Sequence, residues 1–156
     1  MSAVQEVKVQ ARTRALQREI LERTRIEEEL RHVTVLLVDD EPEVRRIVRL
    51  MFEHRGVTVL DAREPEEALE FARAYAGKID VLVADVVMPR QNGKQLSEPV
   101  RALRPDICVL FISGYSAEVL SDRDLLHSGA SLLSKPLDAN TLVSHVVELP
   151  KRPRDA

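Results

Sequence analysis

Acidic, hydroxyl and ammonium side chains follow four apolar runs of the sequence, at or just beyond the point where each run ends. They are Asp39 and Asp40 after the first run, Asp85, Ser113, and Lys135 after the last. Several carboxylates brought close together need a counter-charge, and a hard cation with oxygen ligands such as Mg²⁺ supplies it. A cation, a hydroxyl and an ammonium group together can stabilise a phosphoryl group during its transfer.

The phosphoryl acceptor is expected to be one of these carboxylates. The sequence has no Gly-rich phosphate-binding loop, so a cradled nucleotide is not the predicted source of the phosphate. Asp85 lies on the central run and is the best candidate for a carboxylate nucleophile. Taken alone, Asp39, Asp40 and Glu41 could simply cap a helix. The joint arrangement at matching positions of four runs favours a functional site.

Strand-length apolar runs alternate with helix-period segments from residue 33 onward, which predicts an α/β fold. Runs that are apolar on both faces are typical of a parallel sheet covered by helices, and the carboxyl ends of its strands share one edge. Pro99 within one helical segment predicts a bend or a late start. The predicted strands are 33–38, 57–60, 81–84, 107–112 and 131–133, and the predicted helices are 42–54, 64–75, 93–103, 116–127 and 138–148.

Composition excludes several classes of protein. The 156 residues carry a net charge of -3, which argues against direct DNA binding, and hold one cysteine, Cys108, which excludes a disulfide framework. Cys108 itself is predicted to be a small buried hydrophobe. No apolar run approaches the roughly 20 residues of a membrane-spanning helix, and the polar N-terminus is unlike a secretory signal. We therefore expect no membrane insertion and a cytoplasmic location.

The first 32 residues differ from the rest of the chain. They hold seven basic and six acidic residues and lack Gly, Pro and aromatic residues, which predicts one helix over residues 4–31. The alternatives are a solvated linker helix and a parallel homodimeric coiled coil. Val9, Leu16 and Leu30 share a heptad spacing with Ile20 at the partner position, while Arg23 and Glu27 interrupt the seam.

Residues 33–148 resemble the receiver domain of two-component response regulators over essentially its full length. The resemblance is carried by the segments VLLVDDEPEVRRIV, VLVADVVMPRQNG, VLFISGYS and LLSKPLDANTL, in that order. It implies a flavodoxin-like, doubly wound sheet of five parallel strands in the order 2-1-3-4-5 with five helices. The implied division is an N-terminal helix at 1–32, a receiver domain at 33–149 and a tail at 150–156.

The resemblance also implies residue roles. Asp85 would accept a phosphoryl group from a sensor histidine kinase or a histidine phosphotransfer protein. Asp39, Asp40, Asp85 and the backbone carbonyl of Val87 would hold Mg²⁺. Such a protein is a signalling switch that assists its own phosphorylation and dephosphorylation, and it is not a metabolic enzyme.

Ser113 and Lys135 would contact the phosphoryl group in this reading. Three positions before Lys135, where the family often has an aromatic residue, the chain has Leu132. Two alternatives remain. A phosphohydrolase with an Asp nucleophile usually needs a second Asp two residues later, where this chain has Val87. A dimerising scaffold with a passive receiver is the other alternative, and the intact acidic cluster argues against it.

Overall fold

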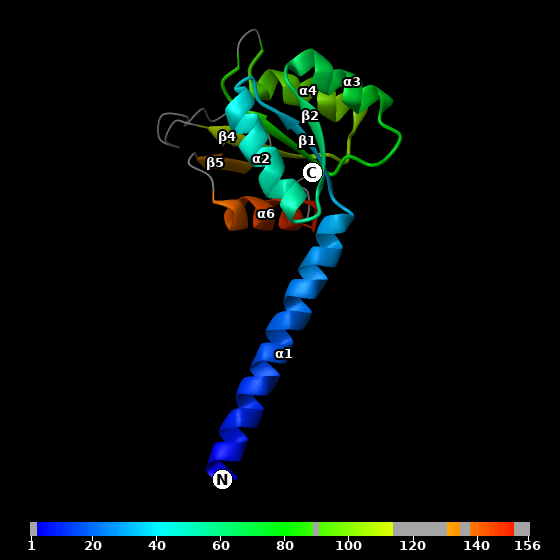
Figure 1. The fold of residues 1–156 in the computed structure, drawn as a ribbon. Coiled ribbons are helices and arrows are strands. Elements are labelled where there is room, and N and C mark those ends of the chain that lie inside the picture. Colours follow the sequence, from blue (N-terminus) through cyan, green and yellow to red (C-terminus); the bar gives the residue numbers. More distant parts are fainter. Residues whose placement is uncertain (1–2, 89–90, 114–130, 135–137, 152–156) are drawn as a thin grey trace.

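The computed structural model describes residues 3–88, 91–113, 131–134 and 138–151 (Figure 1). A long helix leads into a domain built on one sheet. None of the helices in these ranges combines the length and the apolar character that crossing a lipid bilayer requires. The elements are α1 (Ala3–Arg31), β1 (Thr34–Val38), α2 (Pro42–His54), β2 (Thr58–Ala62), α3 (Pro65–Ala74), β3 (Val81–Asp85), α4 (Gly93–Leu103), β4 (Cys108–Ser113), β5 (Ser131–Ser134), α6 (Ala139–Glu148) and a 3₁₀ turn (Leu149–Lys151).

The sheet has five parallel strands in the order β2-β1-β3-β4-β5, as the resemblance implied. Each strand is within two residues of its predicted bounds at both ends, because the apolar runs that mark the strands are those that the helices bury. The segment 116–127, predicted as the fourth helix of the domain, lies outside the described residues.

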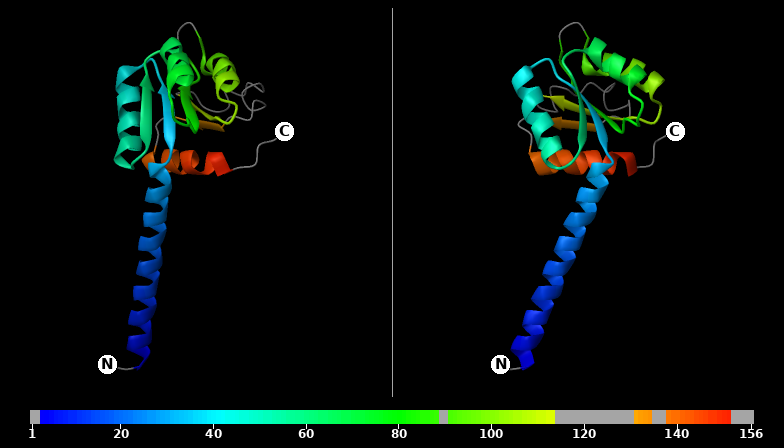
Figure 2. Two further views of the ribbon diagram at one scale, coloured as in Figure 1. Left: turned by 90° about the vertical axis from the view of Figure 1, so that its right-hand side faces the viewer. Right: turned by 45° about the vertical axis from the view of Figure 1, so that its right-hand side comes forward.

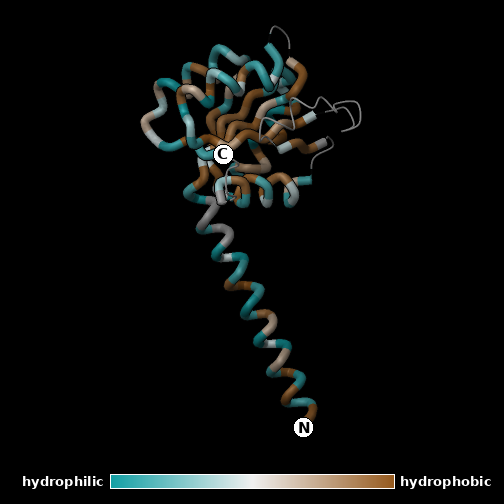
Figure 3. The backbone as a smooth tube through the Cα atoms, turned by 180° about the vertical axis from the view of Figure 1, so that it is seen from behind, coloured by the Kyte–Doolittle hydropathy of each residue, from teal (hydrophilic) through white to brown (hydrophobic). Residues whose placement is uncertain are grey.

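Two apolar layers hold the helices on the sheet. Helices α3 and α4 cover one face, where Leu96 and Val100 of α4 pack on strand residues such as Leu82. Helices α2 and α6 cover the other face, where Phe52 and Leu142 are buried. Figure 2 shows these layers on either side of the strands, and Figure 3 shows the apolar interior of the domain. Residues that alternate along each strand therefore point into different layers.

Local sequence signals explain where the helices begin. Pro42 and Pro65 stand in the first turns of α2 and α3, where a missing N–H costs nothing. Helix α4 begins with a capping box in which Asn92 and Gln95 each bind the other's backbone N–H. The predicted start of this helix at residue 93 is confirmed. A late start of this helix is wrong, since α4 runs from Gly93 through Pro99 to Leu103.

Helix α1 projects away from the domain and joins β1 through two residues, His32 and Val33 (Figure 1). Two hydrogen bonds between Thr34 and Asp80 hold the joint. The Thr34 N–H donates to Asp80 Oδ2 at 2.8 Å, and the Asp80 N–H donates to the Thr34 carbonyl at 2.9 Å. The helix thus leaves the sheet at the amino ends of the strands, opposite the edge that holds the predicted site.

One burial prediction needs correction. Cys108 was expected among the buried core residues, but it is only partly buried. It is the first residue of β4, at the amino edge of the sheet, where it borders a hollow of about 200 Å³ together with Lys78 and Asp106. The end of a strand is covered less completely than its middle, so an apolar run does not by itself guarantee that its first residue is enclosed.

Candidate functional site

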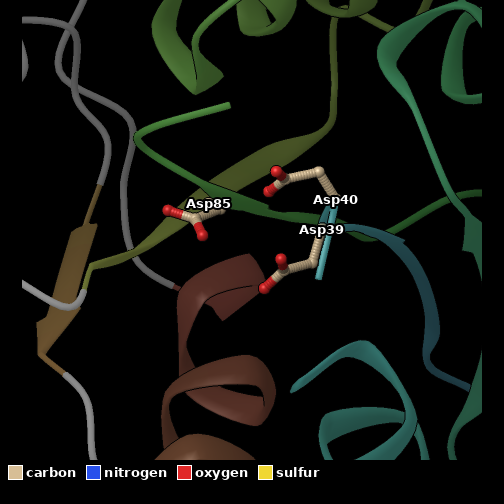
Figure 4. Close-up of side chains that lie close together, drawn as sticks. All are labelled: Asp39, Asp40 and Asp85. Carbon is tan, nitrogen blue, oxygen red and sulfur yellow. The ribbon is translucent and has the colours of Figure 1, made fainter. Parts of the chain in front are cut away.

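Three carboxylates meet at the carboxyl edge of the sheet. Asp85 is the last residue of β3, and Asp39 follows the last residue of the neighbouring β1. Because Val38 pairs with Ala84 in parallel register, the two aspartates stand side by side, with Asp40 next to them. Each of the three offers a carboxylate oxygen, and these oxygens all lie within 4.8 Å of one another (Figure 4).

Backbone hydrogen bonds orient the two inner carboxylates in the same way. Asp39 Oδ1 accepts the N–H of Glu41 at 2.9 Å, and Asp85 Oδ1 accepts the N–H of Val87 at 3.0 Å. Asp39 and Asp85 are only 3% and 6% exposed, whereas Asp40 is exposed. Two carboxylates are therefore fixed in the floor of the site, and a third borders solvent.

The donor set fits a hard divalent cation. Carboxylates this close repel one another unless a positive charge offsets them, and an oxygen-only cluster with an exposed side suits an ion that keeps several waters, such as Mg²⁺. The structure thus brings together the three side chains predicted as metal ligands. Val87, the predicted backbone ligand, is 53% exposed beside them, and the role of its carbonyl stays a prediction.

Ser113 lies at the same edge. It ends β4, next to β3, where Asp85 pairs with Ile112, and it is 1% exposed. It also pairs with Ser134, the last residue of β5, so the strand that leads to Lys135 ends at this edge too. Lys135 itself lies outside the described residues.

Leu132 occupies the position where the family often has an aromatic residue. It pairs with Phe111 across β4 and β5, and it packs partly buried against the core layer under α3 and α4. Its predicted place in a strand is confirmed. The consequence for coupling to Ser113 stays a prediction.

Gly93 is a site residue that the sequence pattern predicts only as a helix start. A Cβ built there would lie 2.5 Å from the backbone oxygen of Asp85 and 3.1 Å from the ring of Phe111. The Gly93 N–H also donates to the Val86 carbonyl at 3.0 Å. Helix α4 therefore approaches the end of β3 closely only because Gly93 has no side chain. The signal in the sequence is a glycine directly after Asn92, at the first position of a helix.

A hollow of about 210 Å³ opens beside the carboxylates. Its walls come from the loops that follow β1, β2 and β3, and the two sides combine apolar and charged groups. The hollow therefore borders the site on the side of β2, and the sequence does not predict it. The lining residues are Asp40, Arg63, Glu64, Pro65, Glu66, Met88 and Gln91.

Comparison with known proteins gives a consistent result. Residues 35–147 match the response regulator receiver domain family. The sensor kinase CckA of Brucella abortus is 36% identical over 116 residues, which make up 74% of this chain but 12% of CckA. The response regulator receiver protein CpdR of the same organism is 28% identical over 115 residues, or 74% of this chain and 94% of CpdR.

A solved structure agrees in fold and sequence. The crystal structure of the receiver domain from the hybrid histidine kinase CckA superposes with a TM-score of 0.64 at 36% identity. The match covers 75% of this chain and 98% of that structure. Helix α1 lies before the matched family segment, which begins at residue 35.

Proposed function

The chain belongs to the response regulator receiver domain family, and from this we propose that it is a phosphorylation switch of a two-component system with Asp85 as the phosphoryl acceptor. The observation that carries the proposal is the trio Asp39, Asp40 and Asp85, gathered within 4.8 Å at the carboxyl edge of the sheet. Asp85 is the member of the trio that ends the central strand, with Ser113 at the end of the next strand.

The proposed step is an in-line displacement at phosphorus. A carboxylate oxygen of Asp85 forms the new O–P bond, while the P–N bond of a phosphohistidine breaks and its electron pair returns to the imidazole nitrogen. Bound Mg²⁺, held by Asp39, Asp40, Asp85 and the Val87 carbonyl, would neutralise charge on the phosphoryl oxygens.

The chain's own residues prepare this step. The Val87 N–H holds one oxygen of Asp85 and so limits the rotation of the carboxylate. Asp39 and Asp85 are almost completely buried, so bulk water reaches little of either side chain. Ser113 donates to a phosphoryl oxygen, and Lys135 supplies a point charge to the same group. The switch assists phosphoryl transfer and its own slow dephosphorylation, and it acts as a signalling module.

The proposed phosphoryl donor is a sensor histidine kinase or a histidine phosphotransfer protein. Support comes from the relatives, since CckA is named a sensor kinase and CpdR a response regulator receiver protein. The chain spans only 12% of CckA, so the activity of that whole protein is not carried over. No direct contact with DNA forms part of the proposal, and the predicted cytoplasmic location stays a prediction.

We propose that the chain divides into three parts. They are an N-terminal helix segment at 1–32, a receiver domain at 33–149 and a tail at 150–156, and the division is supported by α1 at Ala3–Arg31 and by the family match at 35–147. A second proposal, compatible with the first, is a homodimer formed through residues 4–31. It is favoured by the exposure of Leu16 and Ile20, which are 59% and 62% exposed on α1.

A phosphohydrolase with an Asp nucleophile is the weaker alternative. The residue two positions after Asp85 is Val87, where such an enzyme usually has a second Asp acting as acid and base. A lack of turnover of small phosphate esters would agree with the receiver proposal. Steady hydrolysis of such esters would favour the alternative.

Incubation of the full chain with Mg²⁺ and acetyl phosphate tests the main proposal. We expect a mass gain of one phosphoryl group in wild-type protein and none in Asp85→Asn. Asp106→Asn, an exposed aspartate near the opposite edge of the sheet, is the matched control and should gain the same mass as wild type. The absence of any gain in wild type, or an equal gain in Asp85→Asn, would overturn the proposal.

A further inference from the structure

Arg45 connects the carboxylate site to the neighbouring strand β2. It lies on α2 with its side chain only 11% exposed. Its Nη1 donates to the backbone carbonyl oxygen of Asp39 at 2.8 Å, and its Nε lies 2.8 Å from Asp61 Oδ1. One guanidinium therefore contacts both the backbone that carries a predicted cation ligand and an acidic side chain on another strand.

Asp61 of β2 holds the Arg45 side chain in place. It lies in β2, where it pairs with Leu37 of β1, one residue before the end of that strand. Its second oxygen, Oδ2, accepts Arg49 Nη1 at 3.0 Å. Arg45 and Arg49 are four residues apart on α2, so both reach the same carboxylate from one helix face. Because Asp61 already holds the Arg45 guanidinium, that group loses little conformational freedom when it binds the Asp39 carbonyl.

The turn between β1 and α2 depends on this contact. Residues 39–41 present Asp39 and Asp40 to the site, and the turn has two holding points: the Asp39 carboxylate on the Glu41 N–H and the Asp39 carbonyl on Arg45. The first orients the side chain, and the second orients the peptide that leads to Asp40.

We propose that Arg45 is a positioning residue for the cation site: by holding the Asp39 carbonyl, it keeps Asp39 and Asp40 in the arrangement that binds a divalent cation. The inference rests on the proposed function, because it concerns the same site. Arg45 contacts neither the phosphoryl group nor the cation in this role.

The direction of the effect separates positioning from charge. A guanidinium near a cation site repels the cation, so removing it should tighten cation binding if its charge were the main influence. Removing a group that orients the ligands should weaken binding, by about tenfold for a partner of this kind. The two explanations thus predict opposite changes in the dissociation constant.

Arg46 supplies a matched control. It follows Arg45 on the same helix and its side chain is exposed. Arg45→Gln and Arg46→Gln change the net charge of the protein equally, but only Arg45→Gln removes the contacts with the Asp39 carbonyl and Asp61.

The experiment measures Mn²⁺ binding to the full chain by electron paramagnetic resonance of the free ion, with Mg²⁺ as a competitor. We expect Arg45→Gln to weaken binding about tenfold and Arg46→Gln to leave it unchanged. Arg45→Lys keeps the charge but not the fork, and it should behave as Arg45→Gln does. Asp61→Asn should weaken binding less, because the Asp39 carbonyl keeps its donor.

Melting curves without metal, followed by circular dichroism, show whether each variant is folded. A merely structural role would lower the melting temperature of Arg45→Gln and leave its Mn²⁺ dissociation constant as in wild type, which would overturn the inference. Unchanged or tighter binding by a folded Arg45→Lys would overturn it as well. If wild-type protein accepts a phosphoryl group and Arg45→Gln binds Mn²⁺ normally, only the role of Arg45 is refuted. Wild-type protein that neither binds Mn²⁺ nor gains mass refutes the proposed function too.

Discussion

Helices α1 and α2 are built from similar residues but have different surroundings. Both are rich in Arg, Glu and aliphatic side chains. On α2, Val48 and Phe52 are buried against the sheet, whereas Leu16 and Ile20 on α1 are more than half exposed. Figure 3 shows the same contrast, with apolar and polar residues alternating along α1 and an apolar interior in the domain.

The difference shows what stabilises each helix. A helix in a domain gains most of its stability from the apolar face that it buries, while an isolated helix relies on residue propensity and side-chain pairs along its surface. On α1 such a pair joins Arg23 to Glu19 at 3.1 Å, with both side chains exposed. Changes in the receiver core should therefore cost far more than changes on α1.

Phe52→Ala should have the largest effect. The ring is fully buried between α2 and the sheet, and its loss leaves a cavity in one of the two apolar layers. We expect the free energy of unfolding of the receiver domain to fall by about 3–5 kcal/mol. Urea denaturation followed by circular dichroism measures it. A cost below that of the α1 variants at Leu16, Ile20 and Arg23 would break the contrast between the two helices.

Gly93→Ala should come second. The added methyl group meets the Asp85 backbone oxygen at 2.5 Å, so α4 or the end of β3 must shift, at a cost of about 1–3 kcal/mol. Cation binding should weaken too, because Asp85 moves with its backbone.

Gly56→Ala is the control for this variant. Gly56 has a φ of +89°, so alanine costs about 1–2 kcal/mol there, yet the position follows α2 at the far edge of the sheet. Its cation affinity should stay as in wild type. Equal loss of affinity in both variants, measured by Mn²⁺ titration, would show that general destabilisation and not local displacement weakens the site.

Replacement of Leu16 and Ile20 by Asp should separate oligomeric state from domain stability. If α1 pairs with a second copy, the charged seam returns the protein to a monomer, while unfolding of the receiver domain changes by less than about 0.5 kcal/mol. Light scattering across a concentration series measures the mass. Leu21→Asp, an equally exposed residue one position beyond the seam, is the control and should stay dimeric. Wild-type protein that is monomeric at every concentration would leave α1 as a solvated linker.

Arg23→Gln should have the smallest effect. It removes the exposed ion pair with Glu19, which is worth about 0.2–0.5 kcal/mol to the helix. The helical signal at low temperature should fall slightly, and 1 M salt should abolish the difference from wild type because it screens the pair. A change in the melting temperature of the receiver domain would contradict the independence of the two regions.

Patterns that depend on burial were predictable from the sequence. The bounds of α2 and α4 coincide with the predicted segments 42–54 and 93–103, and the carboxyl edge of the sheet holds Asp39, Asp40 and Asp85 as expected. Each of these follows from local periodicity and from the rule that parallel strands end at one edge.

Contacts between distant elements were not predictable in the same way. Nothing in the sequence near Arg45 indicates that its partner is Asp61 on β2, because the pair depends on how α2 rotates on the sheet. The 2.5 Å between a Cβ built at Gly93 and the Asp85 backbone oxygen likewise depends on the packing of α4. The partial burial of Cys108 depends on its position at the end of a strand. Spacing identifies elements, whereas side-chain partners across the sheet require the packed structure.

Because the joint between α1 and β1 is short, a change of angle at the joint would displace the far end of the helix. Only His32 and Val33 separate the two elements, and the reciprocal bonds between Thr34 and Asp80 tie the start of β1 to the residue that precedes β3. With 29 residues, α1 is about 43 Å long, so a tilt of about 10° at the joint carries its far end roughly 7 Å. That displacement approaches the spacing between packed helices, about 8–10 Å. A small rotation at this joint would therefore become a large displacement at the distant end of α1.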